Sequence, residues 1–383
     1  FHYWLSTEGV FGVALGVSTG MVFMFVLFGS LLESAGAGNY FIRTAYAGLG
    51  HMRGGPAKAA VVSSGLTGLV SGSSIANVVT TGTFTIPLMK KVGFSAEKAG
   101  AVEVAASTNG QLTPPVMGAA AFLMVEYVGI SYVEVIKHAF LPAIISYIAL
   151  VYIVHLEACK MGLKGMEKPV TKTVAQKLIS FILTILTLII IGGATYYGLG
   201  WIKTAAGDAA MYVVVPLIAI AYLILIWLAC KVPELEYTHE ITKLPKLRET
   251  AQAGYYFLLP IVVLMWCLTV ERLSPSLSAY YATVVLIFIV LTQRPLKGII
   301  RKNSAPEFAF KMGWDNLIAG MVAGARNMIG IGVATAAAGI VVGTVTLTGI
   351  GLVMTAFVEF ISGGNLLLIL LFTAIISLLL GMG

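Results

Sequence analysis

The chain has 383 residues, of which 58% are hydrophobic and only 11% are charged, and its formal net charge is +7. Because soluble domains carry about 25% charged residues, this composition excludes an ordinary soluble domain and predicts an all-α polytopic membrane protein. The basic residues lie between apolar runs and form no long tract, which argues against nucleic-acid binding and indicates loops that orient the chain in a lipid bilayer.

Apolar runs predict spanning helices along almost the whole chain. The expected spans are 10–35, 96–128, 132–158, 176–199, 209–230, 252–271, 277–293 and about 322–348, with shorter amphipathic helices near 38–50 and 350–362. The chain starts without methionine and stops inside an apolar run. We expect both ends to be cuts through a longer protein.

The first unusual element is the segment 58–92, which is apolar but is interrupted by the turn-forming residues 71–74. Each arm would be roughly 20–25 Å long at 1.5 Å per residue, which is shorter than a hydrocarbon core of about 30 Å. Polar backbone at this depth is tolerated only where it is buried in protein or lines a cavity. The segment is therefore predicted to be a re-entrant helical hairpin.

The next element, 96–128, is predicted to be one helix broken between Ser107 and Pro115. We expect Pro114 and Pro115 to open the second half, because proline is favoured at the first helical position. Carbonyls at helix C-termini attract cations, and amides at helix N-termini attract anions. The hairpin tip and this break together predict a cotransport site for a cation and an anion.

Glycine spacing predicts an internal repeat. The pattern around Gly36 and Gly54 recurs around Gly349 and Gly363, but the first copy's loop is basic and the second copy's loop has no Lys or Arg. Basic connections at 159–177, 231–250 and 294–311 indicate cytoplasmic loops, so the two copies are predicted to be inverted, as in secondary transporters. The expected parts are 1–158 as the first repeat, 159–311 as connecting helices, and 312–383 as the second repeat, ending within its hairpin.

Two motifs carry a resemblance to a known family. "SGSSIANVVTTGTFTIPLMKKVGFS" (71–95) and "EVAASTNGQLTPPVMGAAAF" (103–122) resemble the first hairpin and the broken helix of the large membrane subunit of TRAP (tripartite ATP-independent periplasmic) transporters. "GGNLLLILLFTAIISLLLGMG" (363–383) resembles the start of the family's second hairpin. The likeness is strongest to the fused permeases that work with TAXI-type binding proteins.

This resemblance implies an elevator mechanism in the inner membrane of a bacterium or archaeon. It further implies import of a small organic anion with Na⁺, a periplasmic TAXI-type binding protein, and a small membrane subunit or fused N-terminal helices as partners. By matching positions, the resemblance assigns the cation to Ser71, Ser73, Gly110, Thr113 and Pro115. The family often has Ser after the proline pair, where this chain has Val116.

For the anionic substrate we predict four polar residues around the two breaks, whose alternative roles are satisfying local amides of the turn for Ser74 and hydrogen bonding between helices for Asn109 and Gln111. The four residues are Ser74, Asn77, Asn109 and Gln111. Glu103 lies in an apolar helix, on the face that leads to the break, and is a candidate for coupling. Alternatively, Glu103 forms an ion pair or lies near the cytoplasmic interface of the membrane. The coupling ion is expected to be Na⁺, since carbonyl oxygens suit a hard cation, with H⁺ carried by Glu103 as the alternative.

Other classes of function find less support. "GVSTG" (16–20) matches a serine hydrolase pattern without its strand context, and "HLE" (155–157) lacks the rest of a zinc deaminase signature. We expect no enzymatic activity, no metal site other than the coupling ion, and no cofactor. A channel would need a continuous polar pore. The nearest alternative is an ion-coupled elevator transporter of another two-hairpin family that works without a binding protein.

Overall fold

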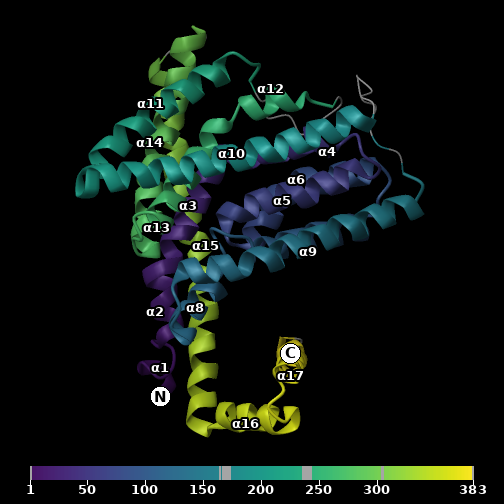
Figure 1. The fold of residues 1–383 in the computed structure, drawn as a ribbon, viewed down its shortest axis with the longest axis vertical. Helices are drawn as coiled ribbons and strands as arrows, with labels where there is room; N and C mark the ends of the chain where they lie inside the picture. The colour runs from purple at the N-terminus through teal and green to yellow at the C-terminus, as the bar shows by residue number, and fades with distance from the viewer. Residues whose placement is uncertain (1, 164, 166–173, 235–243, 303–305, 382–383) are drawn as a thin grey trace. The chain divides into compact units, whose positions relative to one another are not determined.

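A computed structural model describes residues 2–163, 165, 174–234, 244–302 and 306–381 (Figure 1). Every regular element in this described part is helical, which confirms an all-α protein. The elements are α1 (His2–Leu5), α2 (Val13–Val17), η1 (Ser18–Val22), α3 (Phe23–Ser34), α4 (Ala37–Leu49), α5 (Gly55–Ser71), α6 (Ser74–Lys91), α7 (Ala96–Gly110), α8 (Ala119–Val128), α9 (Tyr132–Lys160), α10 (Val174–Ala206), η2 (Gly207–Ala209), α11 (Ala210–Cys230), α12 (Leu247–Gln252), η3 (Tyr255–Leu258), α13 (Leu259–Thr269), α14 (Pro275–Arg301), α15 (Pro306–Thr348), α16 (Ile350–Ser362) and α17 (Leu366–Gly381).

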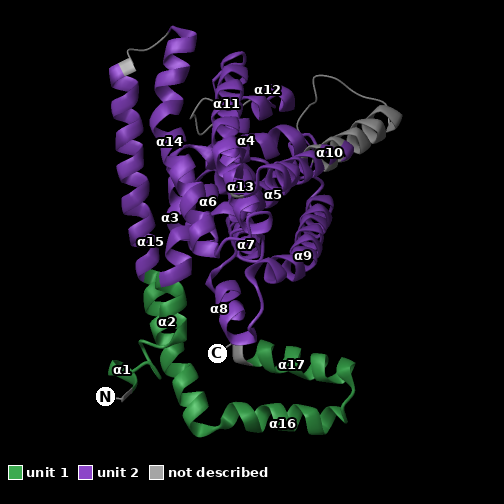
Figure 2. Cartoon of the chain, turned by 60° about the vertical axis from the view of Figure 1, so that its left-hand side comes forward, with its two compact units in different colours: residues 1–19, 330–383 green, residues 20–329 purple. Residues whose placement is uncertain are grey.

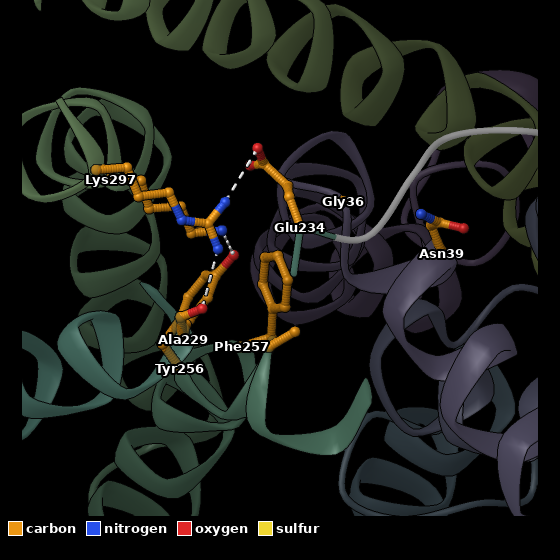
Figure 3. Close-up of a pocket in the computed structure, with 9 residues that line it drawn as sticks. Gly36, Asn39, Ala229, Glu234, Tyr256, Phe257 and Lys297 are labelled. Atoms are coloured by element: carbon orange, nitrogen blue, oxygen red, sulfur yellow. Dashed lines mark hydrogen bonds and ion pairs between the residues drawn. The ribbon is translucent and has the colours of Figure 1, made fainter. Parts of the chain in front are cut away.

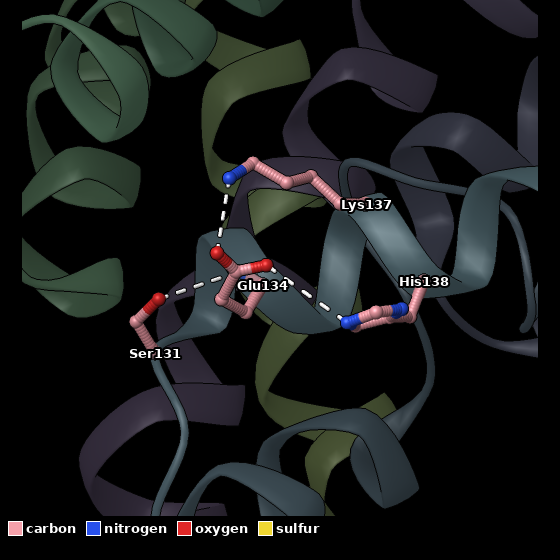
Figure 4. Close-up of polar contacts among 4 residues, drawn as sticks. All are labelled: Ser131, Glu134, Lys137 and His138. Carbon is pink, nitrogen blue, oxygen red and sulfur yellow. Dashed lines mark hydrogen bonds and ion pairs between the residues drawn. The ribbon is translucent and has the colours of Figure 1, made fainter.

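Five helical stretches in the described part are long and apolar enough to cross a membrane, by length and composition. They are Val13–Ser34, Tyr132–Lys160, Ala210–Cys230, Pro275–Arg301 and Glu307–Thr348. The chain is therefore a polytopic membrane protein, as the composition predicted. Charges gather at the start of α9, where Glu134 lies 3.0 Å from Lys137 and 3.9 Å from His138 (Figure 4). After these exposed groups, α9 contains no Asp, Glu, Lys or Arg until its last turn, as a spanning helix requires.

Three predicted spans have different bounds in the structure. The span 252–271 is divided: α12 ends at Gln252, the short helix η3 follows at Tyr255–Leu258, and α13 begins at Leu259. Helix α14 continues through Pro295 to Arg301, whose guanidinium donates to the carbonyls of Ala229 and Val232. Helix α15 starts at Pro306, well before the predicted 322, because hydropathy did not register its charged first turns.

The chain forms two compact units, residues 1–19 with 330–383 and residues 20–329 (Figure 2). In the first unit, the Thr335 hydroxyl donates to the Ser18 hydroxyl over 3.1 Å. The second unit contains the predicted hairpin, in which α5 and α6 lie side by side (Figure 1). Helix α5 also packs against α3, α4, α7 and α9, so it is the centre of this unit.

Small residues allow α5 to be surrounded so closely. A Cβ added to Gly68 would lie 2.5 Å from the Gly110 Cα on α7, and one added to Gly29 on α3 would lie 2.6 Å from the Val70 carbonyl oxygen. Alanines of α5, α7 and α9 complete this core together with Met89 and Phe94. Glycine at helix crossings is the usual means by which membrane helices approach each other.

The glycines of the predicted repeat have matching backbone conformations. Gly36 (φ 103°) and Gly349 (φ 68°) precede the 13-residue helices α4 and α16, and Gly54 (φ 63°) and Gly363 (φ 57°) follow these helices. Left-handed φ values favour glycine, which explains why these positions recur in the sequence. The inversion of the copies and the division at 158 and 311 stay predictions.

Candidate functional site

The hairpin tip is a break of two residues between α5 and α6. Gly72 adopts the left-handed conformation (φ 57°) and ends α5, and Ser73 caps α6 by accepting a hydrogen bond from the Ala76 amide over 3.3 Å. Ser71, at the last turn of α5, is buried. The C-terminal carbonyls of α5 and the N-terminal amides of α6 therefore lie next to each other.

The second break lies further along the chain than predicted, and one expectation about it is wrong. Helix α7 continues to Gly110, and Pro114 and Pro115 do not open the next helix, which starts only at Ala119. The loop between them closes on itself through a 2.9 Å hydrogen bond from the Gly118 amide to the Gln111 carbonyl. Because its backbone is held in this closed form, helix α8 cannot begin at the prolines.

Tyr132 of helix α9 contacts both the loop 111–118 and helix α8. The Tyr132 hydroxyl donates to the Pro115 carbonyl over 2.7 Å, and the Tyr132 ring stacks on Phe122 of α8 with centroids 4.7 Å apart. Val116 and Met117, within the loop, are almost fully buried. The part 114–118 of this irregular segment is thus enclosed by protein, the condition for non-helical backbone inside a membrane.

The structure brings the tip and the loop together. A Cβ added to Gly72 would lie 2.8 Å from the Met117 carbonyl oxygen and 3.3 Å from that of Val116. The Gln111 amide nitrogen donates to the Ser74 hydroxyl over 3.0 Å. The predicted residues Ser74 and Gln111 are therefore neighbours, and the backbone of the tip lies against carbonyls of the loop.

Some of the predicted cation ligands already accept protein hydrogen bonds. The Thr113 hydroxyl donates to the Asn109 carbonyl over 3.0 Å, and the carbonyls of Ser73 and Gly110 accept from the amides of Asn77 (3.0 Å) and Thr113 (3.1 Å). The Pro115 carbonyl accepts from Tyr132. The carbonyls of Gly110 and Pro115 each keep a second lone pair for a cation, whereas that of Ser73 also accepts from the Ser71 hydroxyl over 3.5 Å.

Asn77 is the polar residue most deeply buried at the tip, with 1% of its surface exposed. Its Nδ2 donates to the carbonyl and hydroxyl oxygens of Ser64 over 3.0 and 2.8 Å. Its Oδ1 is buried and has no hydrogen-bond partner among the described residues. An unsatisfied buried oxygen costs about 1–3 kcal/mol, so this atom needs a ligand, a cation or a water.

Glu103 continues this polar network away from the tip. Its carboxylate is fully buried and accepts hydrogen bonds from Thr81 and Thr85 on α6 and from Ser107 one turn along α7. Ser107 in turn contacts Ser64 over 3.1 Å. No basic side chain in the described part of the chain pairs with Glu103.

Sequence reasoning missed several residues of this network. Thr81 and Thr85 are one helical turn apart, and both face Glu103 because residues i and i+4 share a helix face. Gly68 and Ser64 gave no local signal, since their importance depends on the approach of α7. The sequence shows only that Thr81 and Thr85 share one face of a helix; that this face meets Glu103 comes from the structure.

A basic cavity elsewhere in the unit is not part of this site. Lys297 and Arg301 line it together with Glu234 and Tyr256 (Figure 3). Arg301 lies 3.3 Å from the Glu234 carboxylate, and Lys297 donates to the Tyr256 hydroxyl over 2.9 Å. Because both charges already have partners, this cavity is best explained as an anchor for the end of α14.

The sequence is similar to that of known proteins. It matches the family model described as tripartite ATP-independent periplasmic transporter, DctM component, over residues 5–224 and 213–383. It is 30% identical over 191 residues to the C4-dicarboxylate TRAP transporter large permease protein DctM of Vibrio cholerae, covering 49% of this chain and 41% of that protein. The protein of the same name from Pseudomonas aeruginosa is 28% identical over 191 residues, covering 49% of this chain and 44% of the relative.

A third relative, the DctM protein of Rhodobacter capsulatus, is 36% identical over 91 residues, which cover 24% of this chain and 21% of that protein. Each match therefore spans less than half the length of the curated relative. The family model, in contrast, extends over nearly the whole chain and includes both breaks of the candidate site.

Proposed function

Because the chain belongs to the DctM-component family of tripartite ATP-independent periplasmic transporters, we propose that it is the large membrane subunit of a secondary transporter. It imports a small organic anion across the inner membrane and is a permease rather than an enzyme. The observation that carries this proposal is the contact between two helix breaks, where Gly72 lies against the carbonyls of Val116 and Met117. Helix ends of opposite polarity meet there without a charged side chain.

In this proposal the anion binds near the N-terminus of α6, where Ser74 and Gln111 are hydrogen-bonded to each other and partly accessible. Asn77 and Asn109 complete its surroundings. The relatives are named for C4-dicarboxylates, and we propose a carboxylate of this kind as substrate. A carboxylate suits the positive end of a helix dipole and hydroxyl or amide donors.

The coupling cation is proposed to bind at the C-terminal ends of α5 and α7, with Na⁺ preferred. Oxygens of Ser71, Ser73, Gly110, Thr113 and Pro115 are the proposed ligands, and the partnerless Oδ1 of Asn77 supports a cation in this region. Na⁺ takes neutral oxygen ligands of this kind. The part of the chain that carries the hairpin 58–92 and the broken helix 96–128 would then move across the membrane as an elevator, driven by the ion gradient.

Protons on Glu103 are the alternative, and one observation supports them. Thr81 and Thr85 contact Glu103, but their hydroxyls also lie 2.7 and 2.9 Å from the backbone carbonyls of Asn77 and Thr81. Each hydroxyl has one hydrogen and can rotate, so it can donate to the carboxylate or accept from the protonated acid. Glu103 can therefore be hydrogen-bonded in both protonation states.

The test is uptake of radiolabelled succinate by proteoliposomes that contain the full-length permease, its small subunit or fused helices, and its TAXI-type binding protein. Under Na⁺ coupling, uptake is lost when K⁺ replaces Na⁺, and Glu103→Gln retains much of its activity. Under H⁺ coupling, uptake persists without Na⁺, collapses with an uncoupler and is lost in Glu103→Gln. Glu126→Gln, an exposed carboxyl on α8, is the matched control.

Absence of uptake with every tested C4-dicarboxylate would contradict the proposed substrate. The binding protein has its own control: uptake that is unchanged when it is omitted would favour an elevator transporter that works without a partner. The TAXI type is tested by exchanging the binding protein for one of another type, which should not support uptake.

A further inference from the structure

A second carboxyl lies on the opposite side of α6 from Glu103. Glu33, in the last turn of α3, accepts a hydrogen bond from the Thr80 hydroxyl, while the next residue, Thr81, faces Glu103. Within the described part of the chain, Glu33 makes no ion pair with a basic side chain. A partly buried carboxylate without a counter-ion is costly, so its presence requires an explanation.

Glu33 lines a small cavity at the junction of α3, α4 and α5. Its other polar lining residues are Thr67 and Ser71, and the rest of the wall is glycine and apolar side chains. The cavity has a volume of about 10 Å³, which is room for one water-sized sphere. The cavity lies on the side of α5 that packs against α3 and α4. Gly68 lies on another side of α5, against Gly110 at the end of α7.

Thr67 supplies an independent indication of a ligand. It is 5% exposed, and its hydroxyl oxygen is buried without a hydrogen-bond partner among the described residues. A threonine hydroxyl in a helix commonly lies within hydrogen-bond distance of the carbonyl four residues earlier, as those of Thr80, Thr81 and Thr85 do here. Thr67 lacks such a contact, and it borders the same cavity as Glu33.

We infer that Glu33 and Thr67 bind a Na⁺ ion in this cavity, separate from the cation at the hairpin tip. The site offers one carboxylate and a neutral hydroxyl, so a single positive charge balances it and a divalent ion would leave an excess. All its polar groups are oxygens, the ligands of hard cations. The cavity holds one small ion, and the bound ion would satisfy both the uncompensated Glu33 and the partnerless Thr67.

This inference deepens the proposed function, since it adds a Na⁺ site to the coupling machinery, but its test does not depend on transport. Purified full-length protein in detergent is titrated with radioactive ²²Na⁺, with K⁺ keeping the ionic strength constant. We expect Glu33→Gln to remove one equivalent of bound Na⁺. Thr67→Val should lower the Na⁺ affinity of this site about tenfold, because the loss of one ligand oxygen costs a free energy similar to that of one hydrogen bond. Glu126→Gln should bind like the wild type.

Thr67→Val also separates loss of binding from loss of folding. Because the Thr67 hydroxyl has no partner, the variant should melt in K⁺ at the wild-type temperature or above it. Its Na⁺-dependent rise in melting temperature should be smaller than that of the wild type, since a bound ion stabilises the folded state by mass action.

Two results would count against the site, and they are distinguishable. If the wild type binds Na⁺ while Glu33→Gln and Thr67→Val bind it equally well, the cavity is not a Na⁺ site and the proposed coupling is unaffected. If the wild type binds no Na⁺ at all, both this site and Na⁺ coupling are wrong.

Discussion

The two helix breaks of the candidate site are built in different ways. The hairpin tip uses two residues, Gly72 in a left-handed conformation and Ser73 as a helix cap. The loop from Gln111 to Gly118 is held by contacts with other elements, chiefly the Tyr132 hydroxyl of α9 on the Pro115 carbonyl. The tip is therefore a local structure, whereas the loop depends on the packing of distant parts of the chain.

This difference indicates how the site is divided into stable and adjustable parts. A capped turn keeps its form as long as its own residues are present. A loop that is held by a side chain of another helix changes when that helix moves. Substitutions that separate α5 from α7 should consequently have larger effects than substitutions within the tip.

The largest effect is expected at the crossing of α5 and α7. Gly68→Ala places a Cβ 2.5 Å from the Gly110 Cα, a backbone atom that cannot move aside. Overpacking of this kind costs about 3 kcal/mol, and the helices must separate at the point where tip and loop meet. We expect uptake to fall to background and the melting temperature in detergent to fall.

Gly100→Ala on α7 is the matched control, because no atom lies within 4 Å of the added Cβ. Alanine stabilises a helix interior by about 1 kcal/mol relative to glycine, so the two substitutions should shift the melting temperature in opposite directions. Equal shifts at both positions would mean that the close approach of α5 and α7 does not matter.

The next largest effect tests the support of the loop. Tyr132→Phe keeps the ring that stacks on Phe122 and removes the hydroxyl that donates to the Pro115 carbonyl. A buried carbonyl left without its donor costs about 2 kcal/mol. We expect uptake to decrease several-fold. Tyr152→Phe, an exposed tyrosine on the same helix, should have no effect, and a Tyr132→Phe variant with wild-type uptake would show that the loop does not need α9.

The sequence was sufficient to predict the tip but not the loop. Gly72 and Ser73 are themselves the residues that stop one helix and start the next, so their chemistry is visible in the chain. At the loop, Pro114 and Pro115 are good first residues of a helix, yet α8 starts at Ala119. The closure of Gly118 onto Gln111 and the hydroxyl of Tyr132 decide the outcome, and neither is a local property.

The buried carboxyls show the same limit. Glu103 was identified because it interrupts an apolar helix, and Glu33 interrupts the apolar run of α3 in the same way. What the sequence did not predict is that both face α6, through Thr80 on one side and Thr81 with Thr85 on the other. Such pairings depend on which helices become neighbours.

A smaller effect is expected within the tip. Ser73→Ala removes the side-chain oxygen that accepts from the Ala76 amide. Loss of a helix cap costs about 1 kcal/mol, so we expect a modest fall in the melting temperature. Ser73→Asp restores an acceptor and should recover stability. If Ser73→Ala destabilises the protein more than Tyr132→Phe does, the tip depends on its surroundings as much as the loop.

The smallest effect measures the coupling between the two breaks directly. The Gln111 side chain donates to the Ser74 hydroxyl over 3.0 Å, and this is a side-chain contact that joins loop and tip at an exposed position. A double-mutant cycle with Gln111→Ala, Ser74→Ala and both together isolates this pair. Because water competes for both groups, a coupling of about 0.5 kcal/mol is expected for unfolding in detergent. The same cycle measured on uptake should give a larger value if bound anion draws both groups together, since the pair is then shielded from water. A coupling of zero in both measurements would mean that tip and loop communicate only through the backbone contact of Gly72 with Met117.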